Sequence, residues 1–258
     1  MIEVKDLYKE FSGTPVLKGI STTFEKGKTS MIIGQSGSGK TVFLKCLLGL
    51  HIPEKGEICF DGRKHTELDI KSRRQLRKEI GMVFQGGALY DSLTVEENIM
   101  FPLKMFTKNS FAEMLKRVNF VLDRVNLVDA NKKFPAEISG GMQKRVAIAR
   151  AIVMNPKYLF CDEPNSGLDP QTSLVIDHLI QELTKEFNIT TLVVTHDMNS
   201  VMEIGEYIIY LHKGKKEWEG SNEDIIFSQN KLLNDFIFAS GFLQDAKAMR
   251  MMAQKNKL

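Results

Sequence analysis

The sequence predicts an α/β fold built around a phosphate-binding loop, and three observations support this prediction. Residues 34–41 match the pattern G-x-x-x-x-G-K-[ST] at every fixed position. An apolar run at 30–33 indicates a buried strand before the loop, and residues 42–50 have the composition of a helix after it. Further apolar runs, at 158–161 and 190–195, indicate the central strands of a parallel sheet.

The loop itself is suited to hold the phosphates of a nucleotide. Its glycines let backbone N–H groups approach phosphate oxygens, and the following helix points its positive end at the same place. Lys40 offers a positive charge to the β- and γ-phosphates, and the Thr41 hydroxyl can ligate Mg²⁺. The predicted phosphate-binding residues are Gly34, Gln35, Ser36, Gly37, Ser38, Gly39, Lys40 and Thr41.

The other elements follow in order from apolar runs and turn signals. Short strands are expected at 2–7, 16–24, 57–60 and 80–84, with a turn at Asp61-Gly62. The pattern is mostly helical from Gly86 to about Asn155, and a closing hairpin is expected around 208–218. We expect a main domain at 1–220, with a helical subdomain within it at about 86–155. A helical C-terminal extension is expected at 221–258.

Charge and composition argue against several classes of protein. A net charge of +3 over 258 residues gives no global electrostatic reason to bind nucleic acid. The basic segment 71–78 is interpreted as a solvated helix face, because no aromatic residues interleave with its charges. The three cysteines form neither a disulfide framework nor a metal-binding spacing. No apolar run approaches the ~20 residues that cross a bilayer, so any membrane role is expected to need a separate chain.

Two carboxylates, Asp162 and Glu163, follow the apolar run at 158–161. Ligands of open α/β sheets bind at the carboxyl ends of strands, so Asp162 is expected to reach a Mg²⁺ ion that Thr41 helps to hold. Glu163 is expected to act as the general base for the water that attacks the γ-phosphate. The alternative is that both acids cap the turn at 164–167; the upstream phosphate loop favours the catalytic interpretation.

A second anion-binding helix start is expected where a serine and two glycines precede the helical segment 143–154. The serine is a favourable N-cap, and the helix start offers free N–H groups to an anion. A plain capped turn is the alternative. The residues concerned are Ser139, Gly140 and Gly141.

Together these motifs resemble those of the ATP-binding cassette (ABC) ATPases, over essentially the whole chain to about residue 220. Their order is that of the family: the phosphate loop, Gln85 after a strand, Ser139-Gly140-Gly141, Asp162-Glu163, Ser166-Gly167-Leu168-Asp169 and His196. The resemblance implies a P-loop NTPase ABC ATPase core with an antiparallel β subdomain and an inserted helical subdomain. It also implies ATP and Mg²⁺ as cofactors, with ATP hydrolysis coupled to transport.

The resemblance gives roles to residues that mean little singly. Gln85 helps to ligate Mg²⁺ and reports to the membrane partner, His196 contacts the γ-phosphate, and Asp169 lies at the dimer seam. Each ATP is expected between the phosphate loop of one subunit and the Ser139 segment of its partner, which implies a homodimer. Phe11 stands where the family stacks an aromatic ring on adenine; a role in the core is an equal alternative, since other aromatic residues lie nearby.

Two segments, 85–98 and 139–146, resemble the Mla/Mce-type lipid transport ATPases. Met142 replaces the usual Gln of the ABC pattern and Asn165 replaces the usual Thr, and neither change removes a phosphate ligand or the base. This resemblance implies a peripheral subunit at the cytoplasmic face of a bacterial inner membrane, in a complex that moves phospholipids. Its expected partners are an integral membrane permease, an Mce-domain substrate-binding protein and a small STAS-domain protein.

Other functions remain open from the sequence. The main alternative is the ATPase subunit of an amino-acid or other small-solute ABC importer. A soluble ABC protein acting on DNA or ribosomes is disfavoured, because there is one phosphate loop and no long coiled coil between Gln85 and Ser139. A binding module without turnover is disfavoured by the presence of Glu163 and His196. The apolar cluster within 95–106 is either the core of the helical subdomain or a docking site for the permease.

Overall fold

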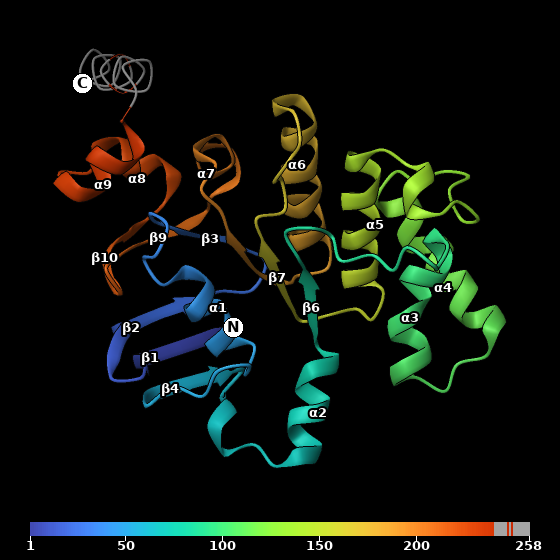
Figure 1. Ribbon diagram of the computed structural model, residues 1–258, viewed down its shortest axis with the longest axis horizontal. Coiled ribbons are helices and arrows are strands. Elements are labelled where there is room, and N and C mark those ends of the chain that lie inside the picture. Colours follow the sequence, from blue (N-terminus) through green and yellow to red (C-terminus); the bar gives the residue numbers. More distant parts are fainter. Residues whose placement is uncertain (240–246, 248, 250–258) are drawn as a thin grey trace. The chain divides into compact units, whose positions relative to one another are not determined.

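The computed structural model describes residues 1–239 together with residues 247 and 249 (Figure 1). The chain divides into two compact units, which we call the α-rich unit and the β-rich unit. The α-rich unit comprises Met1, 25–29 and 67–193. The β-rich unit comprises 2–24, 30–66 and the chain from Val194 onward.

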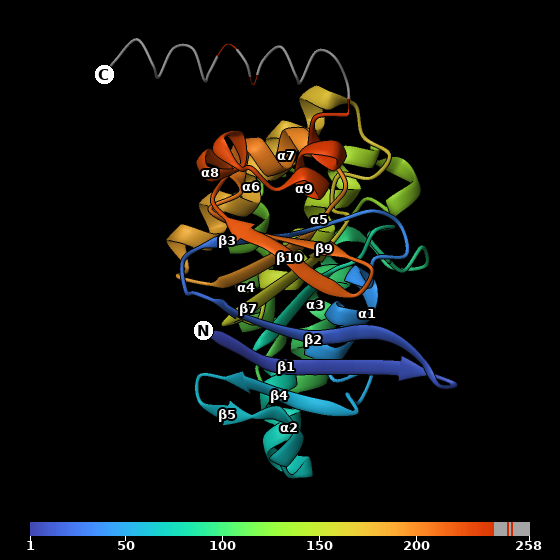
Figure 2. The ribbon, with the colours of Figure 1, turned by 90° about the vertical axis from the view of Figure 1, so that its left-hand side faces the viewer.

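The β-rich unit contains an antiparallel sheet with the strand order β2-β1-β4-β5 (Figure 2). Its strands are β1 (Ile2–Phe11), β2 (Thr14–Phe24), β4 (Lys55–Phe60) and β5 (Arg63–Lys64). The expected turn at Asp61-Gly62 joins β4 to β5, and both residues have positive φ, 47° and 77°. This conformation is the reason that Asp-Gly favours two-residue hairpins. The predicted antiparallel β subdomain is confirmed, with β1 and β2 longer than expected.

The same unit holds a second group of strands in the order β10-β9-β3. They are β3 (Thr29–Ile33), β9 (Tyr207–His212) and β10 (Lys215–Gly220). β3 runs parallel to β9, whereas β9 and β10 form the predicted antiparallel hairpin. All five residues of β3 are buried, as expected of a central parallel strand. Helix α1 (Lys40–Leu47) begins seven residues after β3 ends.

The described part of the β-rich unit also contains three short helices, α7 (Met198–Ile204), α8 (Asn222–Phe227) and α9 (Lys231–Ile237). Ser221 caps α8, and its hydroxyl accepts from Asp224 N. The apolar side chains of α8 and α9 are largely buried, including Ile225 and Leu233. The basic, methionine-rich end of the tail lies outside the described residues, apart from residues 247 and 249.

The α-rich unit has strands in the order β8-β7-β6, of which β6 and β7 run parallel. They are β6 (Ile80–Val83), β7 (Tyr158–Asp162) and β8 (Thr190–Val194), and Ile80 pairs with Tyr158. Helices α2 (Ile70–Lys78) and α6 (Pro170–Glu186) belong to the same unit. The predicted strands at 158–161 and 190–195 are thus confirmed as β7 and β8, and the basic segment 71–78 lies in helix α2.

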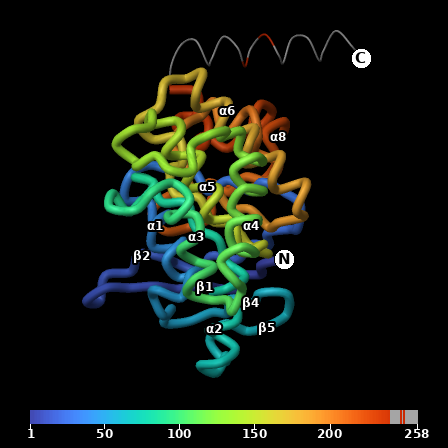
Figure 3. Tube along the Cα trace, turned by 90° about the vertical axis from the view of Figure 1, so that its right-hand side faces the viewer, coloured from blue at the N-terminus to red at the C-terminus, as the bar shows by residue number. Residues whose placement is uncertain are grey.

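The predicted helical stretch consists of α3 (Val95–Phe106), α4 (Phe111–Arg124) and α5 (Gly140–Ile152) (Figure 3). α3 and α4 each begin at a capping box, Thr94 with Glu97 and Ser110 with Glu113. Most of the apolar cluster in α3 is buried, whereas Met105 is 55% exposed. The core interpretation therefore holds for most of this cluster.

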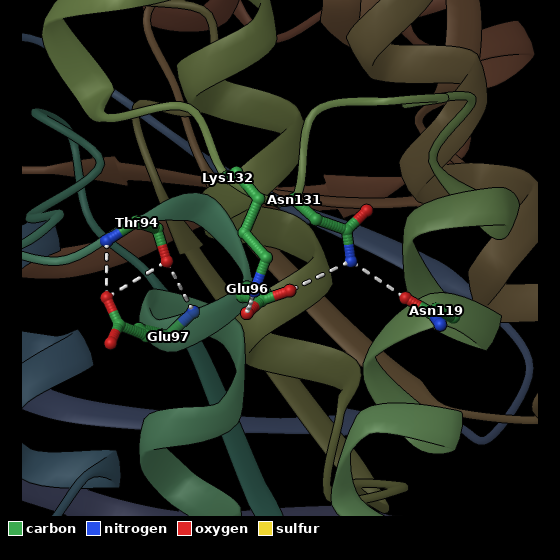
Figure 4. A network of polar contacts seen from close by, with 6 residues as sticks. All are labelled: Thr94, Glu96, Glu97, Asn119, Asn131 and Lys132. Atoms are coloured by element: carbon green, nitrogen blue, oxygen red, sulfur yellow. Dashed lines mark hydrogen bonds and ion pairs between the residues drawn. The ribbon is translucent and has the colours of Figure 1, made fainter.

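A polar network ties α3 to the segment that leads toward α5 (Figure 4). Glu96 is buried and pairs with the ammonium group of Lys132. Asn131 donates to Glu96 Oε2 at 3.3 Å and to Asn119 Oδ1 at 2.8 Å. The backbone N–H of Glu96 also donates to the Asn131 carbonyl at 3.0 Å. These contacts fix the chain that precedes Ser139.

Two further observations concern the described residues as a whole. Within this part of the chain, no helix is both long enough and apolar enough to cross a bilayer. The three cysteines, Cys46, Cys59 and Cys161, are free thiols and all are buried. Burial raises the pKa of each thiol, and that of Cys46 reaches about 11.

Candidate nucleotide-binding and hydrolysis site

The predicted phosphate loop connects β3 to α1 in the β-rich unit. Gly34, Gly37 and Gly39 have φ values of 150°, 76° and 106°, which only glycine adopts without strain. A Cβ atom on Gly34 would lie 2.2 Å from the carbonyl oxygen of Leu211, so no larger residue fits there. The backbone of β9 therefore sets the close approach at Gly34, whereas a Cβ atom on Gly39 would meet Leu17 Cδ2 at 2.9 Å.

Three groups around this loop are suited to an anion. Gly39 is the N-cap of α1 and provides no side-chain acceptor, so the first N–H groups of the helix receive no cap from that residue. The hydroxyl of Ser38 is buried without a hydrogen-bond partner, although its backbone N–H donates to Gln35 O at 3.1 Å. Lys40 Nζ lies over the loop and donates to Gly34 O at 2.6 Å and Gln35 O at 3.1 Å. This arrangement fits the phosphates of a nucleotide.

His196 lies just after the end of β8, in the β-rich unit. The backbone N–H of Thr195 donates to Ile32 O at 3.3 Å, so His196 follows a residue bonded to the strand that leads into the phosphate loop. The side chain of His196 is exposed. Asp197, the next residue, caps α7 by accepting from Asn199 N at 2.9 Å. His196 is thus presented between a buried strand end and a capped helix.

Phe11 is exposed at the end of β1, so the alternative that it belongs to the core is wrong. Its ring meets that of His51 edge-on, with centroids 5.2 Å apart, and Lys9 Nζ lies 5.1 Å from the Phe11 centroid. Of the nearby aromatic residues, Phe24 is fully buried and Tyr8 is exposed. An exposed ring at this position is available for stacking.

The predicted acids lie in the α-rich unit. Asp162 is the last residue of β7, and Glu163 follows with a φ of 48°, in the left-handed region. The turn after Glu163 is closed by Ser166 N, which donates to the Glu163 carbonyl at 3.2 Å, and by buried Asn165, which donates to Asp177 Oδ1 at 2.7 Å. A strained residue at a strand end is typical of a functional site.

Gln85 is connected to this turn and to helix α5. Its Nε2 donates to Ser166 Oγ at 3.3 Å, and its carbonyl accepts from the ammonium group of Lys144. Burial lowers the pKa of Lys144, whereas the negative charge of Glu163 raises it. Lys144 was not among the predicted site residues. The sequence gives no local signal for this contact, because Lys144 stands between Gln143 and Arg145 and its partner is a backbone carbonyl.

The Ser139 segment lies beside the same region of the α-rich unit. Ser139 caps α5, with its hydroxyl accepting from Met142 N at 3.3 Å. A Cβ atom on Gly141 would lie 2.8 Å from Thr172 Cγ2, so the segment packs against the start of α6. Asp169 caps α6 and accepts from Thr172 Oγ1 at 2.6 Å, and these bonds lower the pKa of Asp169.

The structure thus groups the predicted residues into two sets. The β-rich unit holds the phosphate loop, Phe11 and His196, and the α-rich unit holds Gln85, the two acids, the Ser139 segment and Asp169. No cluster of three His, Cys, Asp or Glu residues suited to a metal occurs in the described part of either unit. The predicted Mg²⁺ ligands are instead a hydroxyl, an amide and a carboxylate, which supply the oxygen ligands that Mg²⁺ prefers.

Comparison with known proteins supports the resemblance to ABC ATPases that the sequence motifs indicate. The sequence model of the ABC transporter family matches residues 17–166. The chain is 37% identical to the "Probable ribonucleotide transport ATP-binding protein mkl" of Mycobacterium leprae over 92% of its own length and 68% of that protein. It is 40% identical to the methionine import ATP-binding protein MetN of Clostridium tetani over 87% of its own length and 70% of that protein.

Solved structures agree with these relatives. The dimeric ATP-binding cassette MJ0796, in a post-hydrolysis state bound to ADP and Pi, has a TM-score of 0.77 and 35% identity, covering 86% of this chain and 99% of that one. The cbiO1 protein of Clostridium perfringens, part of the ABC transporter complex cbiONQ, has a TM-score of 0.82 and 31% identity. This match covers 89% of the present chain and 91% of cbiO1. With the family model matched over more than half of its length, the chain belongs to the ABC transporter family and is an ATP-binding cassette ATPase of that family.

Proposed function

We propose that the chain binds Mg-ATP through its phosphate loop and hydrolyses it with Glu163 as the general base. The observation that carries this proposal is the loop: an N-terminus of α1 without a side-chain cap, a buried Ser38 hydroxyl without a partner and the overlying ammonium of Lys40. In this assignment Lys40 binds the β- and γ-phosphates, while Thr41, Gln85 and Asp162 hold Mg²⁺. The metal neutralises charge on the phosphates when bound.

The remaining site residues act around the γ-phosphate and the base. Glu163 orients and deprotonates the attacking water, and His196 contacts the γ-phosphate. Phe11 stacks on adenine. A positioned base typically contributes ~10²–10⁴-fold to the rate.

We infer that two copies of the chain form the working dimer. The Ser139, Gly140 and Gly141 helix start of one copy binds the ATP held by the phosphate loop of the other, with Asp169 at the seam. The dimeric state of MJ0796, named in the description of that structure, supports this inference.

The base assignment is tested with Glu163→Gln. We expect this variant to bind ATP as the wild type does, to lose turnover by at least 100-fold and to accumulate as a dimer with ATP. Lys40→Ala weakens both ATP binding and turnover, and serves as the binding control. The measurements are ATP affinity, steady-state hydrolysis and molar mass in solution; hydrolysis by Glu163→Gln at the wild-type rate would disprove the assignment.

A membrane permease is the proposed partner, and a pocket of about 310 Å³ in the α-rich unit is its proposed docking site. Tyr90, Phe101, Met105 and Phe106 provide its apolar lining. A pocket of this size accepts part of a short helix rather than a whole domain, and an amphipathic helix commonly binds such an apolar groove. The chain would then sit peripherally at the cytoplasmic face of the inner membrane.

The transported substrate is proposed to be a small solute, with an amino acid such as methionine as the first candidate. The names of the relatives support this choice, since they refer to methionine import and ribonucleotide transport. Phospholipid transport, with Mce-domain and STAS-domain partners, is the second candidate and rests on the motif at 85–98. Purifying the native membrane complex and measuring uptake of methionine and phospholipid exchange in proteoliposomes decides between them.

A further inference from the structure

The end of β1 that carries Phe11 extends beyond the neighbouring strand β4 (Figure 2). The register of β1 with β4 runs only as far as Tyr8, which lies opposite Lys55. The register with β2 continues to Phe11, which lies opposite Thr14. Beyond Tyr8, β2 is therefore the strand that pairs with β1, and the other side of β1 is available to side chains from outside the sheet.

Glu54, in the segment between α1 and β4, takes the place that β4 leaves. The backbone N–H of Glu10 donates to Glu54 Oε2 at 2.9 Å, and the N–H of Glu54 donates to the Tyr8 carbonyl at 3.0 Å. The other carboxylate oxygen, Oε1, accepts from the ammonium group of Lys9. This bond lowers the pKa of Glu54, so the carboxylate stays ionised and keeps its hold on Lys9 at neutral pH.

The ammonium group of Lys9 lies between Glu54 and the ring of Phe11. Its Nζ is 5.1 Å from the ring centroid, within the range of a cation–π interaction. The Lys9 side chain is only 11% exposed, whereas Phe11 is 41% exposed. A cation–π interaction is stronger when the cation is shielded from water, so this contact is expected to hold the ring firmly.

A second contact restrains the same ring from the side of the phosphate-loop helix. His51 meets Phe11 edge-on, with ring centroids 5.2 Å apart and an interplanar angle of 75°. The backbone N–H of His51 donates to the carbonyl of Lys45 in the last turn of α1, at 3.2 Å. The exposed ring is thus held by two side chains, and a ring fixed in advance loses less entropy when a ligand stacks on it.

A cation on an aromatic ring also changes what the ring stacks on. The faces of an aromatic ring carry negative charge, so two stacked faces repel each other. An ammonium group draws this charge toward itself, so the ring repels the π-face of a base less. Lys9 is therefore suited to strengthen base stacking on Phe11 without touching the nucleotide.

We propose that Lys9 and Glu54 are positioning residues for the adenine base: Lys9 orients and polarises the ring of Phe11, and Glu54 fixes Lys9. The inference rests on the proposed stacking of adenine on Phe11. It means that Lys9 controls the part of the ATP affinity that comes from the base, whereas the phosphate loop controls the part that comes from the triphosphate.

The test compares the affinities of the full chain for ATP and for inorganic triphosphate, which has no base. We expect Lys9→Met to weaken ATP binding about fivefold and to leave triphosphate binding unchanged. Lys9→Arg is expected to restore ATP affinity, because a guanidinium also binds an aromatic face and a carboxylate. Lys5→Met is the matched control on the same strand: the Lys5 side chain is 66% exposed and lies 4.0 Å from Glu3, and its variant retains both affinities.

Steady-state hydrolysis gives a second measure of the same effect. Lys9→Met is expected to raise the KM for ATP while kcat at saturating ATP stays unchanged, because the base is remote from the γ-phosphate. Glu54→Gln is expected to have a smaller effect of about twofold, since its amide oxygen still accepts a hydrogen bond but carries no charge. A larger effect of Glu54→Gln than of Lys9→Met would contradict the role of Glu54 as a support for Lys9.

A double-mutant cycle separates action through Phe11 from direct contact with the nucleotide. In the Phe11→Ala background, Lys9→Met is expected to change ATP affinity by less than about twofold. Equal losses in both backgrounds would mean that Lys9 binds the nucleotide itself and would overturn the inference. An equal loss of triphosphate affinity in Lys9→Met would overturn it for the same reason.

The inference and the proposed function fail in different ways. Wild-type ATP affinity in Phe11→Ala would disprove the stacking role of Phe11, and the inference would fall with it. Reduced ATP affinity in Phe11→Ala together with wild-type affinity in Lys9→Met would leave the stacking intact and overturn the role of Lys9. If circular dichroism shows that Lys9→Met is unfolded, Lys9→Gln decides the question, because it keeps a donor to Glu54 without the charge; wild-type ATP affinity in that variant would overturn the inference.

Discussion

The loops at 34–41 and 85–88 both present backbone to a functional region, but they are held in different ways. The first is held largely by its own residues, through three glycines with positive φ and through Lys40, which donates to the Gly34 and Gln35 carbonyls. The second is held by Lys144 and Arg150, up to 63 residues further along the chain. When a loop is held by its own residues, their types and spacing form a motif in the sequence. When a loop is held by distant side chains, the sequence of the loop contains no such motif.

The largest expected effect comes from changing Gly34 in the first loop, and Gly86 in the second loop is the contrasting position. Gly34→Ala places a Cβ atom 2.2 Å from Leu211 O, so we expect ATP binding to weaken by about 100-fold or more. Gly86→Ala meets nothing within 4 Å and has no positive φ, so ATP affinity is expected to stay within about twofold. Calorimetric ATP binding checks both, and a loss of affinity in Gly86→Ala would show that the second loop also depends on glycine.

A smaller effect is expected from removing a distant cation. Lys144→Met leaves the Gln85 carbonyl without its donor, so we expect kcat to fall about tenfold or more while ATP affinity changes little. Lys144→Arg restores a donor and is expected to recover part of the rate. Steady-state kinetics and ATP affinity on each purified variant provide the measurement; a parallel loss of affinity would point to general unfolding of the α-rich unit.

The polar network around Glu96 tests how strongly the α-rich unit relies on contacts between distant residues. Glu96→Gln weakens the bond to Lys132 and is expected to cost about 1 kcal/mol of unfolding free energy, or roughly 2–4 °C in Tm. Lys132→Gln is expected to cost less, because the Lys132 side chain is 82% exposed. The measurement is the Tm of each variant by thermal unfolding. A larger decrease in Tm for Lys132→Gln than for Glu96→Gln would contradict this order.

The smallest effect is expected at Met142, where the sequence departs from the usual ABC pattern. Its backbone N–H, rather than its side chain, donates to Ser139 Oγ, and this contact survives substitution. Met142→Gln is therefore expected to change the ATP hydrolysis rate by less than about twofold. Ser139→Ala, which removes the cap, is expected to cost ~1 kcal/mol of stability and serves as the contrasting variant.

The sequence sufficed for the features whose physics is local. The phosphate loop, the Asp61-Gly62 hairpin and the buried parallel strands each depend on a few neighbouring residues, and each was predictable from them. Lys144 and Arg150 were not predictable as loop ligands, because their acceptors are backbone carbonyls, which every residue carries. The exposure of Phe11 also required the structure, since an aromatic residue at a strand end suits the core and the surface equally.

The buried thiols have a practical consequence for labelling. A thiol reacts with maleimide through its thiolate, and the raised pKa values of Cys46, Cys59 and Cys161 keep all three protonated near neutral pH. All three are buried in the folded chain. A single cysteine introduced at an exposed position is thus expected to be modified selectively, without first replacing the native three. The native cysteines are therefore expected to add little background label in fluorescence and cross-linking measurements.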